Sequence, residues 1–472
     1  MYLKKIGEAL KQEIFKKKYE TLIAPTRRKK SELHERSIDL QFLSDKSRVV
    51  ASSAFRRLQA KAQVFSLEEN AAVRTRLTHS IEVSLVGQLI AYRVFQRLVE
   101  KGHIAPTLLI PFTSSVETAC LLHDIGNPPF GHFGESAIRD WVSQKFKSEK
   151  DQTLLPFIDS LARFDGNAQG FRIITRLQRH KSDYGLNLTC TQIASTIKYP
   201  TGDKKISYFK ADENIYADIC QNLDLPTAGR HPLSLLMEAA DDIAYCMSDI
   251  EDGIEKKIVT GESALDCIKE AISTIKNRDA ANVILDTLTK IEKDQECDTG
   301  IKKFIEFKIS ITQKLVEWAV DSYINSEVAI LDGTFEHGLL KEGTAFEVLF
   351  AIKSFAKKKL FNSCHAYDIE LSGHSIVVGI LDSFNRIIDL NESSFAALLE
   401  DTGPHSLALE QRLIWLLPKK HIEVYKACVK NGSLPEMVAR THLIVDYVSG
   451  MTDPHALKVY QILKGIKVGV RT

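Results

Sequence analysis

The most informative segment of this 472-residue chain is Cys120–Glu135, CLLHDIGNPPFGHFGE. His123 and Asp124 stand side by side at the end of an apolar run, and a turn rich in glycine and proline follows them. Imidazole and carboxylate groups together suit a divalent cation that keeps positions open for water and substrate. His132 and Glu135, three residues apart beyond the turn, are groups that general acid–base chemistry needs. The segment therefore predicts a metal site at the end of one helix and an acid–base pair at the start of the next.

A second segment, Arg74–Ser80 (RTRLTHS), opens an amphipathic helix that we expect to run to about Val99. It contains His79, a further candidate ligand. Arg76 lies one turn before His79 on the same helix face, so its guanidinium points toward whatever the metal binds. A structural salt bridge is the alternative role for this arginine.

A third segment, Glu238–Asp249 (EAADDIAYCMSD), carries acids among apolar residues in a helical pattern. Asp241, Tyr245 and Asp249 recur every four residues and therefore share one helix face. Asp242 points about 100° away from that face. We therefore favour Asp241 over Asp242 as a metal ligand.

Together these segments resemble the HD-domain metal phosphohydrolases, and within that superfamily the bacterial deoxyguanosine triphosphate triphosphohydrolases. The order of the four candidate ligands matches the H…HD…D pattern of the superfamily. The resemblance covers residues 40–455, with two small departures: Asp165 stands where Glu is more usual, and Ala62 where Thr is common. Besides the three segments above, it rests on Ser53–Gln59 with Gln63 and Val64, Gly166–Arg172, Glu238–Asp252 and Asp446–Asp453.

The resemblance implies a metal centre and a catalytic pair. The implied ligands are His79, His123, Asp124 and Asp241. The implied metal is Mg²⁺ or Mn²⁺, with iron or another transition metal as the alternative. His132 is expected near the α-phosphate, with Glu135 orienting or protonating it. The alternative role of this glutamate is electrostatic, because an acid in a first helical turn is favourable by itself.

The resemblance also implies a set of substrate contacts. Tyr245 is expected to pack on the deoxyribose and Asp249 to bind its 3′-hydroxyl, whereas Gln63 would read the base edge. Core packing is the alternative for the tyrosine, and a surface amide for the glutamine. Contacts with the triphosphate are expected from Arg76, Asn167, Lys198, Tyr199 and Lys210, and a contact from a neighbouring subunit by Glu370.

The function that follows is metal-dependent hydrolysis of dGTP, or of other dNTPs, to the deoxynucleoside and inorganic triphosphate. The family forms homohexamers, so a homo-oligomer is expected, and single-stranded DNA or an allosteric nucleotide is a further candidate partner. Two alternatives stay open. One is another HD nucleotide phosphohydrolase, such as a nucleotidase or a phosphodiesterase. The other is a non-catalytic module that binds nucleotides or single-stranded DNA.

Composition is that of an ordinary globular protein, with 44% hydrophobic and 26% charged residues. A net charge of +1 argues against a polyanion-binding surface over the whole molecule. Arg27–Lys30 is a local basic patch, which we expect to be a solvated arm; a contact with nucleotide phosphates or DNA is the alternative. The eight cysteines form no CxxC pair, which is typical of a reducing compartment. No signal-peptide or membrane-spanning run is recognised. We expect a cytoplasmic protein without a membrane partner.

Helical periodicity dominates the chain and predicts an all-α fold. We expect an N-terminal arm over residues 1–49, an HD core over 50–256 and a helical C-terminal lobe over 257–472 that packs on the core. Thr201–Asp203 is expected to turn at most a small β-hairpin. Helices are expected at residues 78–100, 115–124, 134–146, 190–197, 232–256, 262–276, 279–293, 301–325, 345–359, 375–388 and 407–430.

Overall fold

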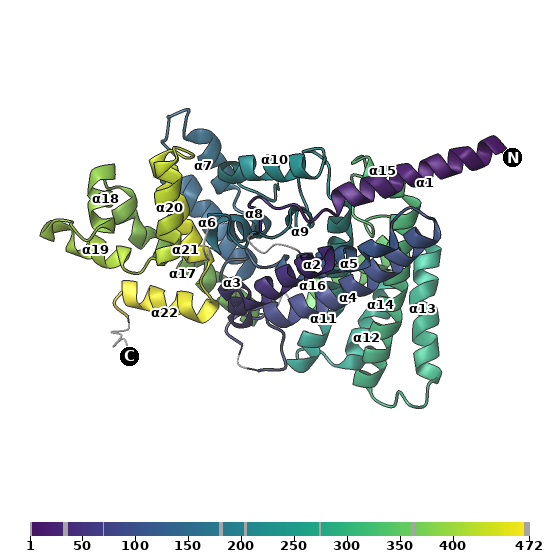
Figure 1. Cartoon of the computed structure of the whole chain (residues 1–472). Helices are drawn as coiled ribbons and strands as arrows, with labels where there is room; N and C mark the ends of the chain where they lie inside the picture. The colour runs from purple at the N-terminus through teal and green to yellow at the C-terminus, as the bar shows by residue number, and fades with distance from the viewer. Residues whose placement is uncertain are drawn as a thin grey trace.

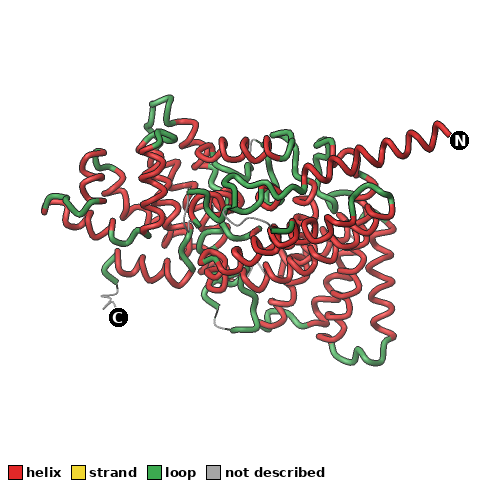
Figure 2. The backbone as a smooth tube through the Cα atoms, viewed as in Figure 1, coloured by secondary structure: helices red, strands yellow, loops and turns green. Residues whose placement is uncertain are grey.

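The computed structural model describes residues 2–31, 36–68, 70–178, 183–202, 205–272, 275–359 and 364–466, without the side chains of residues 2–6, 355–359 and 364–370. Over these residues the chain is helical and contains no β-strand, which confirms the predicted all-α class (Figure 2). The described residues on either side of the expected hairpin form no strand, and the Ser207 amide donates to the Tyr199 carbonyl at 2.9 Å.

Three helices form the centre of the molecule: α4 (Arg76–Glu100), α5 (Leu109–Leu122) and α11 (Pro232–Glu255). α4 begins with a capping box, in which the side chains of Thr75 and Thr78 accept each other's backbone amides. α5 is apolar around most of its circumference and is buried along nearly its whole length. It packs against both α4 and α11, so the end of α5 faces the helices that carry the other candidate ligands.

One hydrophobic cluster lies on the right of Figure 1. It joins the central helices to two N-terminal helices and to the first part of the C-terminal region. These are α1 (Tyr2–Leu22), α2 (Ile38–Ala51), α12 (Gly261–Ile272), α13 (Arg278–Lys293), α14 (Gly300–Asn325), α15 (Glu327–Leu331) and α16 (Gly343–Lys359).

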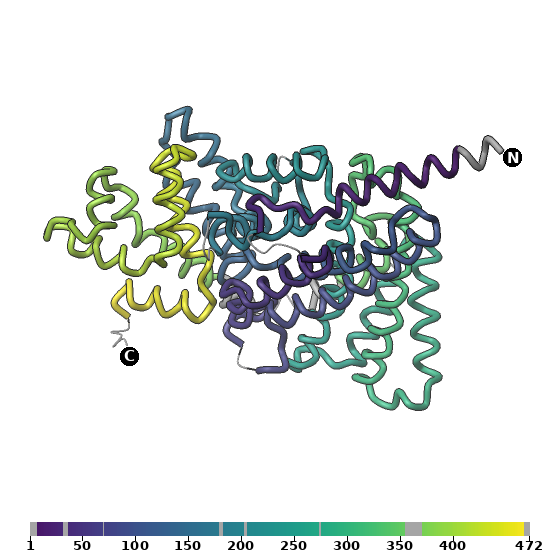
Figure 3. Tube along the Cα trace, in the orientation of Figure 1, coloured from purple at the N-terminus to yellow at the C-terminus, as the bar shows by residue number. Residues whose placement is uncertain are grey.

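A second cluster lies on the left of Figure 1 and combines two distant parts of the sequence. The first part is α3 (Ser53–Arg57), α6 (Gly131–Lys145), α7 (Leu155–Ala162), α8 (Gly166–Arg172), α9 (Cys190–Ala194) and α10 (Glu213–Asn222). The second is α17 (Cys364–Ile388), α18 (Glu392–Leu399), α19 (Ala408–Ile414), α20 (Lys419–Lys430), α21 (Glu436–Ser449) and α22 (Asp453–Leu463). The trace in Figure 3 ends on this side, whereas the N-terminus lies at the far end of α1.

A buried ionic network fastens α21 to α8. The Arg172 guanidinium, 2% exposed, donates from Nε to Asp446 at 2.9 Å and from Nη1 to Asp212 at 3.3 Å. Gln169 donates to the same Asp446 carboxylate at 3.0 Å. Because neither the arginine nor its partners reach water, each charge depends on the others for compensation.

Several expectations about individual helices are wrong. The segment 407–430 is not one helix, because the chain breaks between α19 and α20 and Pro418 stands at the start of the latter. α17 begins at Cys364, well before the expected residue 375. The basic patch at Arg27 is not a solvated arm, since this guanidinium is buried and donates to Asp45 at 2.8 Å. Among the described residues, no helix combines the length and apolarity needed to cross a membrane.

Candidate active site

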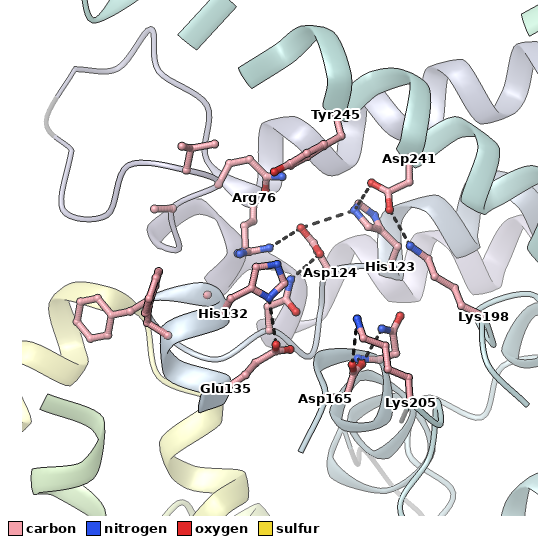
Figure 4. Close-up of a pocket in the computed structure, with 18 of the residues that line it drawn as sticks. Arg76, His123, Asp124, His132, Glu135, Asp165, Lys198, Lys205, Asp241 and Tyr245 are labelled. Carbon is pink, nitrogen blue, oxygen red and sulfur yellow. Dashed lines mark hydrogen bonds and ion pairs between the residues drawn. The ribbon is translucent and has the colours of Figure 1, made fainter. Parts of the chain in front are cut away.

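A cavity of about 450 Å³ opens where α4, α6, α8 and α11 meet the turn after α5 (Figure 4). Most of the residues singled out from the sequence line it. From the four ligand candidates and the acid–base pair, the lining includes His123, Asp124, Asp241, His132 and Glu135. His79 lies behind this surface and is fully buried.

His79, His123 and Asp241 form a group that can hold a metal ion, with one ligand atom from each within 4.8 Å of the others. Nε2 of His79 lies 3.5 Å from the Asp241 carboxylate, and Nε2 of His123 lies 3.4 Å from it. Nδ1 of His123 is 2.6 Å from the Cys120 carbonyl, so this nitrogen carries the proton and Nε2 keeps its lone pair. Among the described residues, neither Nε2 atom has a hydrogen-bond partner. Two imidazole nitrogens without hydrogen-bond partners, next to a carboxylate, fit a divalent cation.

The electrostatics of the group are those of a site for a cation. Burial alone would raise the pKa of Asp241, but Lys198 and the two histidines hold it well below its usual range. Burial opposes protonation of His79, yet Asp241 beside it raises the pKa of the imidazole. Nζ of Lys198 donates to the outer oxygen of Asp241 at 2.7 Å. Negative charge is thus concentrated on an ionised carboxylate next to two imidazoles.

Asp124, the fourth predicted ligand, lies beside this group. Its carboxylate is 3.6 Å from Nε2 of His123 and is held by Arg76 at 2.6 Å and by the Asn127 amide at 2.5 Å. Although burial opposes it, the Arg76 guanidinium keeps the pKa of Asp124 well below its usual range. A ligand role for Asp124 stays a prediction.

Asp242, the carboxylate that the helical spacing argued against, also lines the cavity but does not belong to the metal group. Its two oxygens accept from Lys341 at 2.6 Å and from Lys353 at 2.7 Å. Of the two neighbouring acids, Asp241 is the one beside the histidines.

The second pair, His132 and Glu135, lies at the start of α6. Phe130, immediately before α6, has a left-handed backbone with φ of +62°, and this turn directs His132 into the cavity. The imidazole is 86% exposed, and its Nδ1 lies 3.0 Å from the Glu135 carboxylate. The other oxygen of Glu135 accepts from the Gly166 amide at 2.8 Å. Glu135 therefore bridges His132 to α8.

The charge state of Glu135 follows from these contacts. Burial would raise its pKa, but the hydrogen bonds from His132 and Gly166 lower it below the ordinary value. As an ionised carboxylate can only accept, Nδ1 of His132 must be the donor. Nε2 of His132 is then the nitrogen available to a reacting group.

The polar side chains predicted to contact the triphosphate or the base lie on the cavity wall, with the exception of Lys210. The lining includes Gln63, Arg76, Asn167, Lys198 and Tyr199. Lys210 is not among the lining residues, and its ammonium is half-exposed and paired with Glu213. The structure thus does not bring Lys210 to the cavity.

Two lysines that the sequence reasoning missed do line the cavity. Lys205 comes from the turn between Tyr199 and α10, and its ammonium lies 3.8 Å from Asp165. Lys353 comes from α16, far beyond α11 in the sequence, and lies 5.8 Å from the ring centre of Tyr245. In the sequence, only the neighbouring basic residues indicated that Lys205 could contact a phosphate. No local pattern indicated that Lys353 would line the cavity.

Tyr245 and Asp249 continue along α11 from Asp241. Tyr245 lines the cavity, and its ring meets that of His79 edge to face at 6.5 Å between centres. Asp249 lies one turn further, is 1% exposed and is not among the residues that line the cavity. Neither of its oxygens has a hydrogen-bond partner among the described residues. Burial raises its pKa to about 7. The side chain of Glu370 lies outside the described residues.

One cavity thus gathers a histidine and carboxylate cluster that can hold a metal ion, a hydrogen-bonded pair of histidine and glutamate, and several cations, as a metal-dependent phosphohydrolase requires. Comparison with protein families agrees, since residues 76–163 match the family model of the HD domain. The match contains His79, the His123–Asp124 pair, His132 and Glu135. Asp241 and Tyr245 lie beyond it, on α11.

Proposed function

We propose that this protein hydrolyses dGTP, and in second place other dNTPs, to the deoxynucleoside and inorganic triphosphate. The observation that carries the proposal is the arrangement of α11. Asp241 belongs to the candidate metal group, whereas Tyr245 and Asp249 extend from it along one helix face. A substrate with its α-phosphate at the metal group would then have its sugar beside Tyr245.

The metal site fits the expected cofactor, Mg²⁺ or Mn²⁺ with iron or another transition metal as the alternative. His79, His123 and Asp241 would hold the ion, with Asp124 completing the set. A bound divalent ion supplies Lewis acidity to a phosphate oxygen and lowers the pKa of water.

Cationic side chains would bind the triphosphate. Arg76, Lys198 and Lys205 line the cavity, together with Asn167 and Tyr199. Arg76 and Lys198 now neutralise Asp124 and Asp241. A metal ion that took over those carboxylates would release both cations for phosphate oxygens, to which a guanidinium donates two hydrogen bonds at once.

His132 and Glu135 handle the proton. With Nδ1 donating to Glu135, a protonated His132 offers the hydrogen on Nε2 to the 5′-oxygen. A water oxygen bonds to the α-phosphorus and the water loses a proton to solvent, while the bond from phosphorus to the 5′-oxygen breaks. The proton of His132 passes to the departing deoxynucleoside, and His132 takes up a proton from solvent before the next turnover. Acid–base assistance of this kind contributes about 10²–10⁴-fold in rate.

The proposed contacts with the sugar account for the preference for a deoxynucleotide over a ribonucleotide. A tyrosine ring against the ribose leaves little room for a 2′-hydroxyl, and the unpartnered Asp249 offers an acceptor for the 3′-hydroxyl. Gln63, whose Oε1 is also buried without a partner among the described residues, is the proposed contact to the base.

A panel of dNTPs and NTPs, assayed with Mg²⁺ and with Mn²⁺, tests the proposal. The wild type should turn over dGTP with a much higher kcat/KM than GTP, and 2′,3′-dideoxy-GTP should be poor. Tyr245→Ala should lower dGTP turnover and narrow its advantage over GTP. Equal kcat/KM for GTP and dGTP in the wild type would refute the deoxynucleotide assignment and favour another nucleotide phosphohydrolase.

Assembly is part of the same proposal. A homohexamer would bring subunits together near their cavities, with Glu370 of one chain as the proposed contact to the next. Sedimentation of the full chain, with and without dGTP, measures the oligomeric state.

A further inference from the structure

The Asp446–Asp453 motif lies outside the reaction described above, yet its last residue binds two segments that line the cavity. Asp453, at the start of α22, is 3% exposed. One of its oxygens accepts from the Phe130 amide at 3.1 Å, and the other accepts from the Ala62 amide at 3.1 Å. One buried carboxylate therefore holds two separate backbone segments, and in Figure 4 the yellow C-terminal ribbon passes beside the start of α6.

Both segments lead directly into the proposed site. Ala62 precedes Gln63, the proposed base contact, and Phe130 stands two residues before His132. Phe130 has the left-handed backbone, which a residue with a bulky side chain adopts only when its surroundings impose it. Its ring packs against Gly373 of α17, where any larger residue would collide with it. The C-terminal helices thus hold Phe130 by its amide and by its side chain.

Lys61 makes a parallel connection one residue away. This lysine is 3% exposed, and its ammonium donates to the Asn127 carbonyl in the turn and to the Ser449 carbonyl of α21 at 3.0 Å. Its own carbonyl accepts from the Arg76 amide at 3.0 Å, at the start of α4. Lys61 and Asp453 therefore connect three parts of the chain: the segment before Gln63, the turn before His132 and the end of α21.

We infer that Asp453 is a positioning residue, which fixes the Gln63 segment and the His132 turn relative to each other and so sets the reach of His132 to the α-phosphate. The inference rests on the proposed function for its effect on rate. The hydrogen bonds that carry it exist whatever the substrate is. Displacing a reacting group by about 1 Å typically costs about 10²-fold in rate.

Two variants and one control test this role. Asp453→Ala removes both acceptors, and Asp453→Asn keeps the shape and one acceptor. Asn391→Ala is the control, because Asn391 caps α18 through the Ser394 amide at 2.8 Å, far from the turn. It removes a stabilising cap of similar kind without touching the segments that Asp453 holds.

The measurements are kcat for dGTP, metal content and hydrogen exchange in peptides that span Ala62 and Phe130. We expect Asp453→Ala to lose about 10²-fold in kcat, Asp453→Asn to lose less, and both to keep the metal. Exchange should accelerate in both peptides. Asn391→Ala should leave kcat and both peptides unchanged.

Two results would overturn the inference. One is wild-type exchange in both peptides of a folded Asp453→Ala protein. The other is accelerated exchange with a wild-type kcat, which would leave Asp453 a purely structural residue. If the wild type does not release triphosphate from dGTP, the proposed function fails, whereas exchange in the two peptides still decides whether Asp453 anchors them.

Discussion

Asp249 should weaken the fold at neutral pH, and replacing it with asparagine should stabilise the protein while reducing its activity. Its carboxylate is buried without a hydrogen-bond partner among the described residues, and burial raises its pKa from an ordinary 3.8 to about 7. Between these two pH values the folded chain binds a proton that the unfolded chain has lost, so stability falls as the pH rises through this window. At 1.36 kcal/mol per pKa unit, the difference of about three units corresponds to at most about 4 kcal/mol above pH 7.

The assay compares the thermal midpoints of wild type and Asp249→Asn from pH 4 to pH 8. A chelator is present throughout, because a bound cation near Asp249 would lower its pKa. The two proteins should melt together near pH 4, and the variant should melt several degrees higher at pH 8. Asp286→Asn, on the exposed face of α13, should match the wild type at every pH. In dGTP turnover, Asp249→Asn should fall well below the wild type, since a neutral amide is a weaker acceptor for the 3′-hydroxyl. A variant that is no more stable than wild type at pH 8 would refute the reasoning.

Three further predictions concern the metal group, the acid–base pair and the buried network. Asp241→Ala should abolish turnover and most metal binding, whereas Asp242→Ala should leave a measurable enzyme; metal retained by Asp241→Ala would reverse the choice of ligand. Glu135→Ala should lower kcat by about 10²–10⁴-fold with metal content intact, and an unchanged kcat would reduce it to a helix-start residue. Arg172→Met should cost about 3–5 kcal/mol in a urea titration, because Asp446 loses its buried counter-charge; a loss below about 1 kcal/mol would show that the network is not needed for stability.

The spacing of residues in the sequence was sufficient to predict which side chains lie together when they belong to one helix. The four-residue spacing of Asp241, Tyr245 and Asp249 indicates that these residues share a face of α11. In the structure Asp241 lies beside the histidines. The start of α4 was predicted closely, because its apolar residues recur with a helical period along one face. Spacing failed for α5, which is apolar on nearly all sides and so offers no periodic contrast to mark where it begins.

Tertiary contacts account for the rest. Lys205 and Lys210 belong to one lysine-rich segment, and only the path of the turn decides that the first lines the cavity and the second pairs with Glu213. Lys353 reaches Tyr245 because α16 packs on α11, a contact that no local pattern encodes. The break at Pro418 was readable, since proline cannot continue a helix, but the apolar period on both sides of it outweighed that signal.

The phosphate product of dGTP hydrolysis tests the central claim most directly. Wild-type protein with Mg²⁺ or Mn²⁺ should convert dGTP to deoxyguanosine and inorganic triphosphate. Phosphorus NMR detects the phosphate product, and chromatography measures the nucleoside. The account requires the triphosphate to appear intact, in step with the deoxyguanosine. Release of pyrophosphate with dGMP, or of monophosphate with dGDP, would contradict it.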